Sequence, residues 1–276
     1  MINIFIEHQF KLLKDKLDVT PGVALNYFSD FNFNDNYKNN FFRNFLAYPG
    51  IDVGYKINEN LRAYSNIGYT YRVPTYTDLY YSSPTTIGNE KLIPEKALSE
   101  EIGIRYFKNS LSLSFVLFKR KAKDLIDYVK SIESDPWQAT NIRELNTSGI
   151  ETSLGIKIYG NNKKNHYINL GYSYLKDDLI PSEIQYSRYA INSLKHHVTS
   201  NINIALTKKL SSSIIYKYAE RTSGNNYSVV DIKAQLVFKK FDFSIMVNNV
   251  FETEYYETNL VPMPGRSYLF SLRYNR

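Results

Sequence analysis

The chain has 276 residues, no cysteine and a formal net charge of +7. The lack of cysteine excludes a disulfide framework and a thiolate metal site. No run of about 18 apolar residues is present, so a transmembrane helix is not expected. The net charge would suit nucleic acid, but no nucleic-acid partner is predicted because many lysines form short clusters typical of solvated turns. These clusters are Lys14 and Lys16, Lys163 and Lys164, Lys208 and Lys209, and Lys239 and Lys240.

Tyrosine and phenylalanine are the informative residue types, with 25 and 16 copies against one tryptophan. Such aromatic richness suits strands and interfaces more than helix cores. Residues 61–72 alternate between an apolar side with Leu61 and Ile67 and a charged side with Arg62 and Arg72, which is the period of a strand. We therefore predict an all-β protein. In chain order the alternation predicts thirteen strands, near residues 4–13, 17–28, 45–57, 61–72, 97–107, 110–129, 141–158, 166–176, 196–206, 210–220, 227–238, 241–250 and 265–275.

The connections between these strands alternate in length. Strands of about ten residues, with short turns at one end and long loops at the other, are the layout of an outer-membrane β-barrel. A soluble β-sandwich also alternates, but its polar face does not need full charges deep in the strands. Because single-chain barrels close with an even number of strands, thirteen indicates part of a larger barrel or a count that is off by one. The short connections lie near 14–16, 58–60, 108–109, 160–165, 207–209 and 239–240, and the long ones near 29–44, 73–96, 130–140, 177–195, 221–226 and 251–264.

Two segments carry a recognisable order of motifs. Residues 71–106, "YRVPTYTDLYYSSPTTIGNEKLIPEKALSEEIGIRY", have an Arg-x-Pro-Thr strand end that leads through "DLY" and an Asn-x-x-Leu-x-Pro-Glu loop into the next strand, and in this they resemble the barrel segment of TonB-dependent outer-membrane receptors. The segment "VNNVFETEYYETNLVPMPGRSYLFSLRY" resembles the closing part of the same barrel. "SGIETSL" and "VVDIKAQLVF" also fit. The motif residues, for which the resemblance implies a structural role in bracing strand ends, are Arg72, Pro74, Pro94, Glu95, Pro264, Gly265 and Arg266.

The resemblance implies an antiparallel transmembrane β-barrel, of which residues 1–276 would be the C-terminal portion of a barrel of about 22 strands, without the plug domain. It places the protein in the outer membrane of a Gram-negative cell, in contact with outer-membrane lipid. It implies energy coupling to TonB through a plug absent from this chain. The last strand carries Tyr274, where the family has an aromatic residue read by the barrel-assembly machinery, although here Asn275 and Arg276 follow it.

Receptors of this family import scarce nutrients, so a small-molecule nutrient ligand is expected, either cobalamin or an iron siderophore. The stretches "RVPTYTDLYY" and "PMPGR" are most similar to cobalamin-type receptors. A passive outer-membrane channel, or a non-functional truncated receptor fragment, are the alternatives. Candidate ligand contacts are aromatic or charged loop residues, for which packing within the loop or anchoring at the membrane interface is the competing interpretation. They are Tyr76, Asp78, Tyr80, Tyr81, Trp137, Tyr255 and Tyr256.

Enzyme chemistry has little support in the sequence, and neither a cofactor nor a metal is predicted. No Gly-x-Ser-x-Gly or His-Glu-x-x-His motif occurs. Because neighbouring strand residues point to opposite faces, His196 and His197 are not expected to share a metal ion.

Overall fold

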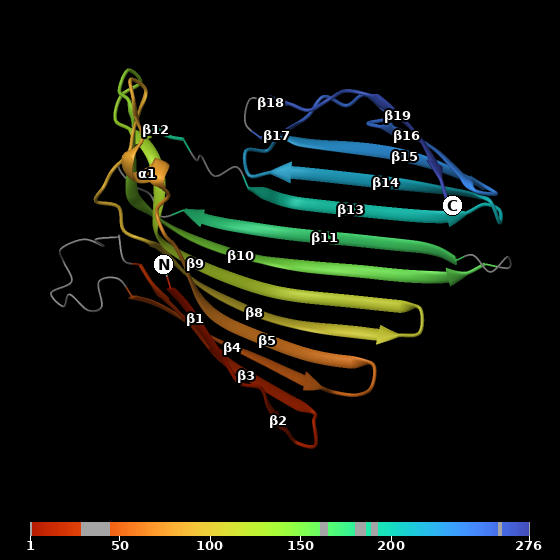
Figure 1. Ribbon diagram of the computed structural model, residues 1–276, viewed down its shortest axis with the longest axis horizontal. Coiled ribbons are helices and arrows are strands. Elements are labelled where there is room, and N and C mark those ends of the chain that lie inside the picture. Colours follow the sequence, from red (N-terminus) through yellow and green to blue (C-terminus); the bar gives the residue numbers. More distant parts are fainter. Residues whose placement is uncertain are drawn as a thin grey trace. The chain divides into compact units, whose positions relative to one another are not determined.

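Strands form most of the protein (Figure 1). The all-β prediction is confirmed, and each of the thirteen predicted strands has a counterpart, the first of them split in two by a break at His8 and Gln9. The predicted loop 29–44 lies outside the described residues. The computed structural model describes residues 2–28, 45–160, 165–179, 186–188, 193–258 and 261–275.

The strand bounds follow the alternation closely. The counterparts of the predicted strands are β1 (Ile2–Glu7) with β2 (Phe10–Leu12), β3 (Leu17–Tyr27), β4 (Phe45–Lys56), β5 (Leu61–Arg72), β8 (Glu95–Lys108), β9 (Leu111–Lys130), β10 (Trp137–Tyr159), β11 (Asn165–Leu179), β13 (Leu194–Ala205), β14 (Leu210–Arg221), β15 (Asn226–Phe238), β16 (Phe241–Asn248) and β19 (Ser267–Tyr274). The connections add the short elements α1 (Tyr76–Tyr80), β6 (Ser82–Ser83), β7 (Thr86–Ile87), β12 (Tyr186–Ser187), β17 (Tyr256–Thr258) and β18 (Val261–Pro262).

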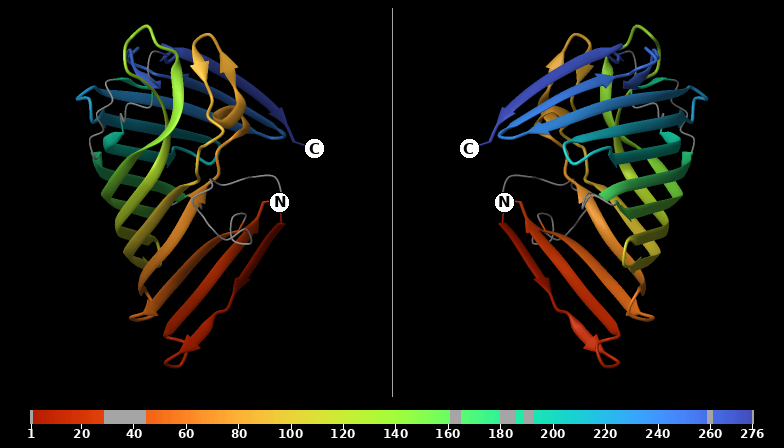
Figure 2. Two further views of the ribbon diagram at one scale, coloured as in Figure 1. Left: turned by 90° about the vertical axis from the view of Figure 1, so that its left-hand side faces the viewer. Right: turned by 90° about the vertical axis from the view of Figure 1, so that its right-hand side faces the viewer.

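The chain divides into two compact units, and β8 to β11 contribute residues to both. In unit 1, β1, β3, β4 and β5 pair in that order, each antiparallel to the next (Figure 2). Gly22, Gly50 and Gly68 face one another across three of these strands. Unit 1 comprises Met1–Ile104, Leu117–Gly149 and Lys176–Ile191, and unit 2 comprises Arg105–Val116, Ile150–Leu175 and Asn192–Arg276.

In unit 2, β11, β13, β14, β15, β16 and β19 form a run of antiparallel neighbours. Tight turns join β13 to β14 at 206–209 and β15 to β16 at 239–240, as predicted. The connection near 221–226, predicted among the long ones, is a turn of only residues 222–225, because β14 and β15 stay paired until Glu220 faces Asn226.

Strands β9 and β10 are much longer than a bilayer requires. They contain 20 and 23 residues, whereas a spanning strand needs about 9–11. The predicted loop 130–140 is therefore reduced to residues 131–136. The extensions persist because they find new partners: Trp137 and Gln138 of β10 pair with β7, and Val129 and Lys130 of β9 pair with β12.

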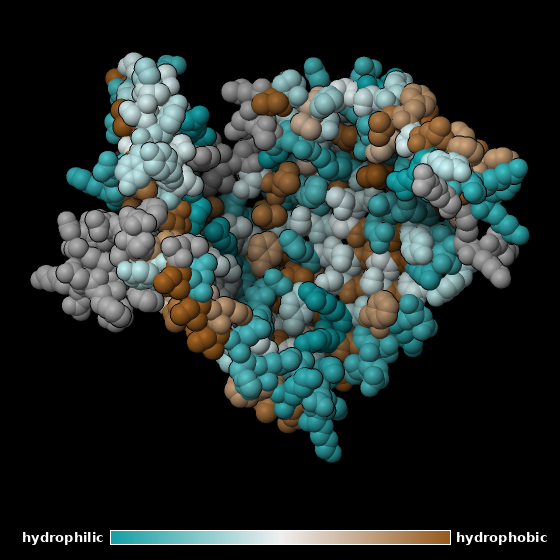
Figure 3. Space-filling view, viewed as in Figure 1, coloured by the Kyte–Doolittle hydropathy of each residue, from teal (hydrophilic) through white to brown (hydrophobic). Residues whose placement is uncertain are grey.

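Large apolar side chains of unit 2 are exposed along one face of the strands. On β19, Phe270 keeps 72% and Leu272 63% of its surface accessible, and Ile245 and Phe243 on β16 are exposed beside them. A β-sandwich would bury this face against a second sheet, and a soluble monomer rarely exposes so large an apolar patch. The surface in Figure 3 carries many hydrophilic side chains. The exposed apolar face argues against the sandwich and suits strands that face lipid.

The only helix in the described ranges, α1, spans five residues, and none there is long and apolar enough to cross a membrane.

Candidate functional site

The connection from β5 to β8 begins with a one-turn helix that the local sequence specifies. Pro74 and Thr75 precede α1, and the Thr75 hydroxyl accepts a hydrogen bond from the Asp78 backbone N–H at 3.1 Å. In return, the Asp78 carboxylate accepts one from the Thr75 backbone N–H at 2.9 Å. This reciprocal pair is a capping box, with aspartate in place of the more usual glutamate. The motif "PTYTD" therefore builds its own helix start.

Asp78 is the buried centre of an ionic network in unit 1, in which the Arg72 side chain stays about half exposed. Only 7% of Asp78 is exposed. One carboxylate oxygen accepts a hydrogen bond from the Tyr128 hydroxyl at 3.1 Å, and the other lies 3.3 Å from a guanidinium nitrogen of Arg72. A second nitrogen of Arg72 donates to Glu95 at 2.6 Å, and the same Glu95 oxygen accepts from the Ile126 backbone N–H at 2.8 Å. Arg72 thus links the loop to β8, and Glu95 links it to β9.

These contacts also set the charge state of Asp78. Burial acts to raise the pKa of the Asp78 carboxyl, but hydrogen bonds from Thr75 and Tyr128 and the positive charge of Arg72 outweigh it. The pKa is held below its ordinary value, so the carboxylate stays ionised at neutral pH. Its oxygens are occupied by protein partners, and a ligand would have to displace one of them to touch it.

An apolar cluster lies beside the network. Leu79, Leu92, Ile126, Tyr128 and Ala139 are buried together, and Trp137 packs against them. Pro74 and Pro94 are buried as well. The long extensions of β9 and β10 supply four residues of this cluster, so the α1 loop packs against these two strands.

Two asparagines tie the backbone of this loop to β10. The Asn89 side chain donates to the Ala139 carbonyl at 3.1 Å. The Asn141 side chain accepts from the Ile93 backbone N–H at 2.8 Å and donates to the Ile93 carbonyl at 2.9 Å. Sequence reasoning missed Asn141 and Tyr128, because their partners lie 48 and 50 positions away and no local motif marks them.

The three tyrosines of the loop point outward. Tyr76 is 77% exposed, Tyr80 and Tyr81 are about half exposed, and the rings of Tyr76 and Tyr80 lie 5.0 Å apart. Also in unit 1, the Lys130 ammonium lies 4.9 Å from the Trp137 ring and 5.5 Å from the Tyr186 ring. Four of the seven residues predicted to contact a ligand, Tyr76, Tyr80, Tyr81 and Trp137, thus share the unit that holds the buried Asp78.

The closing segment in unit 2 carries the remaining predicted residues. The Tyr255 ring lies 4.7 Å from Tyr227, while Tyr256 is exposed on β17. Burial raises the pKa of the Tyr255 hydroxyl, Lys217 opposes the rise, and Glu257 adds to it. Glu257 forms an ion pair with Lys217 of β14, which holds β17 against that strand.

Asn249 anchors the start of this segment. It is almost fully buried, its backbone N–H donates to Asp231 at 2.7 Å, and its side chain exchanges two hydrogen bonds with the Thr253 backbone. Of the motif residues, Arg266 donates to the Val250 carbonyl at 2.9 Å, Pro264 accepts a hydrogen bond from Asn249, and Gly265 lies in the chain between them. These hydrogen bonds join the closing segment to residues that directly follow β16.

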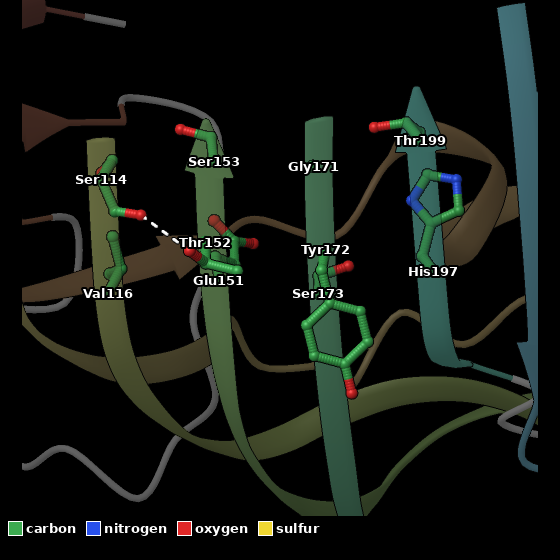
Figure 4. A pocket seen from close by; sticks show the side chains of 10 residues that line it. All are labelled: Ser114, Val116, Glu151, Thr152, Ser153, Gly171, Tyr172, Ser173, His197 and Thr199. Carbon is green, nitrogen blue, oxygen red and sulfur yellow. Dashed lines mark hydrogen bonds between the residues drawn. The ribbon is translucent and has the colours of Figure 1, made fainter. Parts of the chain in front are cut away.

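A polar hollow of about 240 Å³ lies in unit 2 between β9, β10, β11 and β13 (Figure 4). Glu151, Ser153, His197 and Thr199 contribute polar groups, and none of these four was predicted as a site. Gly171 opens the space, because a Cβ atom there would lie 2.7 Å from the Thr199 hydroxyl. Across the described ranges, no three His, Cys, Asp or Glu side chains are grouped to hold a metal ion.

Comparisons with known proteins identify the family to which the chain belongs. Residues 2–250 match the model of the family described as TonB dependent receptor-like, beta-barrel. The vitamin B12 transporter BtuB of Photobacterium profundum is 25% identical over 232 residues, which cover 80% of this chain and 36% of that protein. BtuB of Vibrio vulnificus is 27% identical over 101 residues, which cover 37% of this chain and 16% of that protein.

Solved structures show the same fold. The siderophore receptor PirA from Pseudomonas aeruginosa superposes with a TM-score of 0.71 at 17% identity, over 99% of this chain and 47% of that one. The FrpB iron transporter from Neisseria meningitidis gives 0.71 at 16% identity, over 99% of this chain and 44% of that one. The chain spans about a third of the length of the first BtuB relative and just under half of these solved structures.

Proposed function

The chain belongs to the TonB-dependent receptor β-barrel family, whose members are outer-membrane transporters and not enzymes, and on this premise we propose that it takes part in TonB-dependent uptake of a scarce nutrient. The observation that carries the proposal is the family match over residues 2–250. Because the chain spans only part of its relatives, uptake by the whole protein, its coupling to TonB through a plug domain, and its insertion by the barrel-assembly machinery are all parts of the proposal. We also propose that residues 1–276 form the C-terminal portion of the barrel domain.

Cobalamin is the ligand we propose first, and a ferric siderophore second. Both curated relatives are vitamin B12 transporters. The siderophore and iron receptors among the solved structures are below 25% identity and support the fold alone. Either ligand is a large organic molecule that already holds its metal, which is compatible with described residues that group no metal-binding side chains.

The exposed aromatics are the proposed contacts. Tyr76, Tyr80 and Tyr81 expose their rings to solvent on a loop that packs against a buried apolar cluster. The loop therefore loses little conformational entropy when a flat ligand stacks on these rings. Trp137 with Lys130, in the same unit, is proposed to add a further contact. Tyr255 and Tyr256, in unit 2, are proposed as ligand contacts of that unit by itself. Asp78 contributes by fixing α1, together with Arg72, Glu95, Pro74 and Pro94.

Equilibrium binding tests the proposal. The folded protein is titrated with cyanocobalamin and, separately, with a ferric catecholate siderophore, and bound ligand is measured after gel filtration. Cyanocobalamin is expected to be retained, and Tyr76→Ala combined with Tyr80→Ala is expected to weaken its affinity about tenfold, as the loss of an aromatic contact does. As a control, Tyr159→Ala removes an exposed tyrosine at the last residue of β10, the strand that begins at Trp137. This variant is expected to leave binding unchanged.

The two ligands and the rival channel give different results. Retention of the siderophore alone would keep the uptake proposal and replace its ligand. Steady ion conductance in a planar bilayer, with neither ligand retained, would instead favour the passive channel and overturn the proposal.

A further inference from the structure

The exposed apolar face of unit 2 contains a groove. It measures about 540 Å³ and runs across β14, β15, β16 and β19. Two rows of paired residues form its walls: Leu236, Phe243 and Leu272 in one, and Ala234, Ile245 and Phe270 in the next. Ala234 is the smallest of the six, so the hollow opens where its side chain ends. The groove is lined mainly by apolar side chains, which suits a hydrocarbon chain.

One end of this groove meets two lysine-bearing turns. Lys208 and Lys209 lie in the turn before β14, and Lys239 and Lys240 lie in the turn before β16. The two turns are neighbours, because the Val237 backbone N–H donates to the Lys209 carbonyl at 2.8 Å. Both are at the short-turn end of the strands, which in barrels of this type is the periplasmic end.

The lysine ammonium groups stand over aromatic rings at the end of the groove. Lys209 and Lys239 lie 4.9 Å and 5.7 Å from the ring of Phe238, and Lys240 lies 5.9 Å from the ring of Tyr274. Phe238 follows Leu236 on the same face of β15, and Tyr274 follows Leu272 on the same face of β19. Three positive charges are thus held at the point where the apolar groove ends.

Neither turn contains an acidic residue that could neutralise these lysines. Residues 206–210 and 236–241 contain no Asp or Glu, and none of the four exposed lysines forms an ion pair within the described part of the chain. The nearest acidic residue in sequence, Asp242, alternates with Phe241 and Phe243 onto the other face, where it accepts a hydrogen bond from Asn275. Among the other short turns, 57–60 and 109–110 contain no lysine, and Lys14 and Lys16 flank Asp15. The connection 160–165 also carries two lysines, Lys163 and Lys164, which lie outside the described residues.

We propose that this site binds an anionic glycerophospholipid, with one acyl chain in the groove and its phosphate held by Lys209, Lys239 and Lys240. Charge complementarity identifies the occupant. The groove is apolar along its walls and ends at lysines without an acidic partner, which matches a molecule with a hydrocarbon tail and a phosphate head. The site does not depend on which nutrient is transported.

Native mass spectrometry of the full chain in detergent tests the proposal, with phosphatidylglycerol and phosphatidylcholine of identical acyl chains as probes. One phosphatidylglycerol is expected to remain bound in preference to phosphatidylcholine. A lysine near an anionic lipid surface corresponds to a factor of about five in affinity, so Lys209→Gln, Lys239→Gln and Lys240→Gln together are expected to weaken phosphatidylglycerol binding more than about tenfold. Phosphatidylcholine binding should change little.

Two further variants separate head and tail. Lys14→Gln with Lys16→Gln removes the same kind of charge from another turn and should leave binding unchanged. Ala234→Phe fills the hollow and should weaken binding of both lipids, with the fold of each variant checked by circular dichroism. Equal binding of the two lipids, an unaffected triple variant, or displacement by inorganic phosphate at equal concentration would overturn the proposal, the last by making this a site for free phosphate.

Discussion

The loop around α1 and the apolar face of β14 to β19 are both rich in large apolar and aromatic residues. The loop buries these side chains, whereas the strands expose them. Around α1, Leu79, Leu92, Ile126 and Tyr128 are buried behind a hydrogen-bonded ionic network. On the strands, Phe270 and Leu272 stay exposed. The first arrangement is that of a protein in water, and the second is that of a protein in lipid.

The difference shows that the solvent of each region decides what stabilises it. In water the α1 loop must bury apolar surface and pair its charges, so it acquires a small core of its own. Strands in lipid satisfy their backbone by pairing with each other and can leave their apolar side chains outward. Four predictions test whether the α1 loop is stabilised by burial and the strands by contact with lipid, from the largest expected effect to the smallest.

A charge on the lipid-facing side should have the largest effect. Ile245→Arg places a guanidinium in the middle of β16 on the exposed apolar face and is expected to destabilise the membrane-inserted fold by about 2–4 kcal/mol. Urea titration of the protein in vesicles measures this. The neighbouring Ser244→Arg points to the other face and should cost much less. Equal losses for the two variants would contradict the assignment of the faces.

Removing the centre of the α1 network should come next. Asp78→Ala leaves the buried Tyr128 hydroxyl and one side of Arg72 without their carboxylate, and it breaks the capping box. A loss of about 2–3 kcal/mol in the unfolding free energy of this region is expected. The fluorescence of Trp137, the single tryptophan, reports it because this ring packs on the same core. Glu90→Ala, at an exposed carboxylate of the same loop, is the matched control.

The tight packing of the α1 loop can be tested with glycines. At Gly88 a Cβ atom would lie 2.8 Å from the backbone C and O of Leu79. Backbone cannot move aside as a side chain can, so Gly88→Ala is expected to cost about 1–3 kcal/mol. At Gly68 on β5 the nearest atom would be 3.9 Å away, and Gly68→Ala should be tolerated within about 0.5 kcal/mol. Urea unfolding followed by Trp137 compares the two variants, and similar losses would contradict close packing at Gly88.

The smallest effect is a pH dependence of the α1 loop. The folded protein holds the pKa of Asp78 below its ordinary value of 3.8. The stabilisation from this group is therefore fully present above that value and is lost as the pH falls below it, through the folded pKa. Trp137 fluorescence in an acid titration should show this loss in the native protein. Asp78→Asn should remove that component, and an unchanged acid transition in the variant would contradict the role of Asp78.

The sequence by itself determined the features that depend on neighbours along the chain. The alternation of apolar and polar residues located the strands, because side chains of a strand point to its two faces in turn. The start of α1 is also a local feature, because its capping box joins Thr75 and Asp78 within three residues. Arg72, Pro94 and Glu95 were marked by their resemblance to a family segment, with a bracing role that remains a proposal.

The tertiary structure alone decided which distant residues meet. Tyr128 reaches Asp78 across 50 positions, and Asn141 holds Ile93 across 48, so neither appears in any local pattern. The extension of β9 and β10 into the predicted loop 130–140 depends on the partners they find in β12 and β7. The groove likewise exists only because the register places Ala234 beside Ile245, and Ile245 beside Phe270. Register is a property of paired strands, and a single strand's sequence contains only half of each pair.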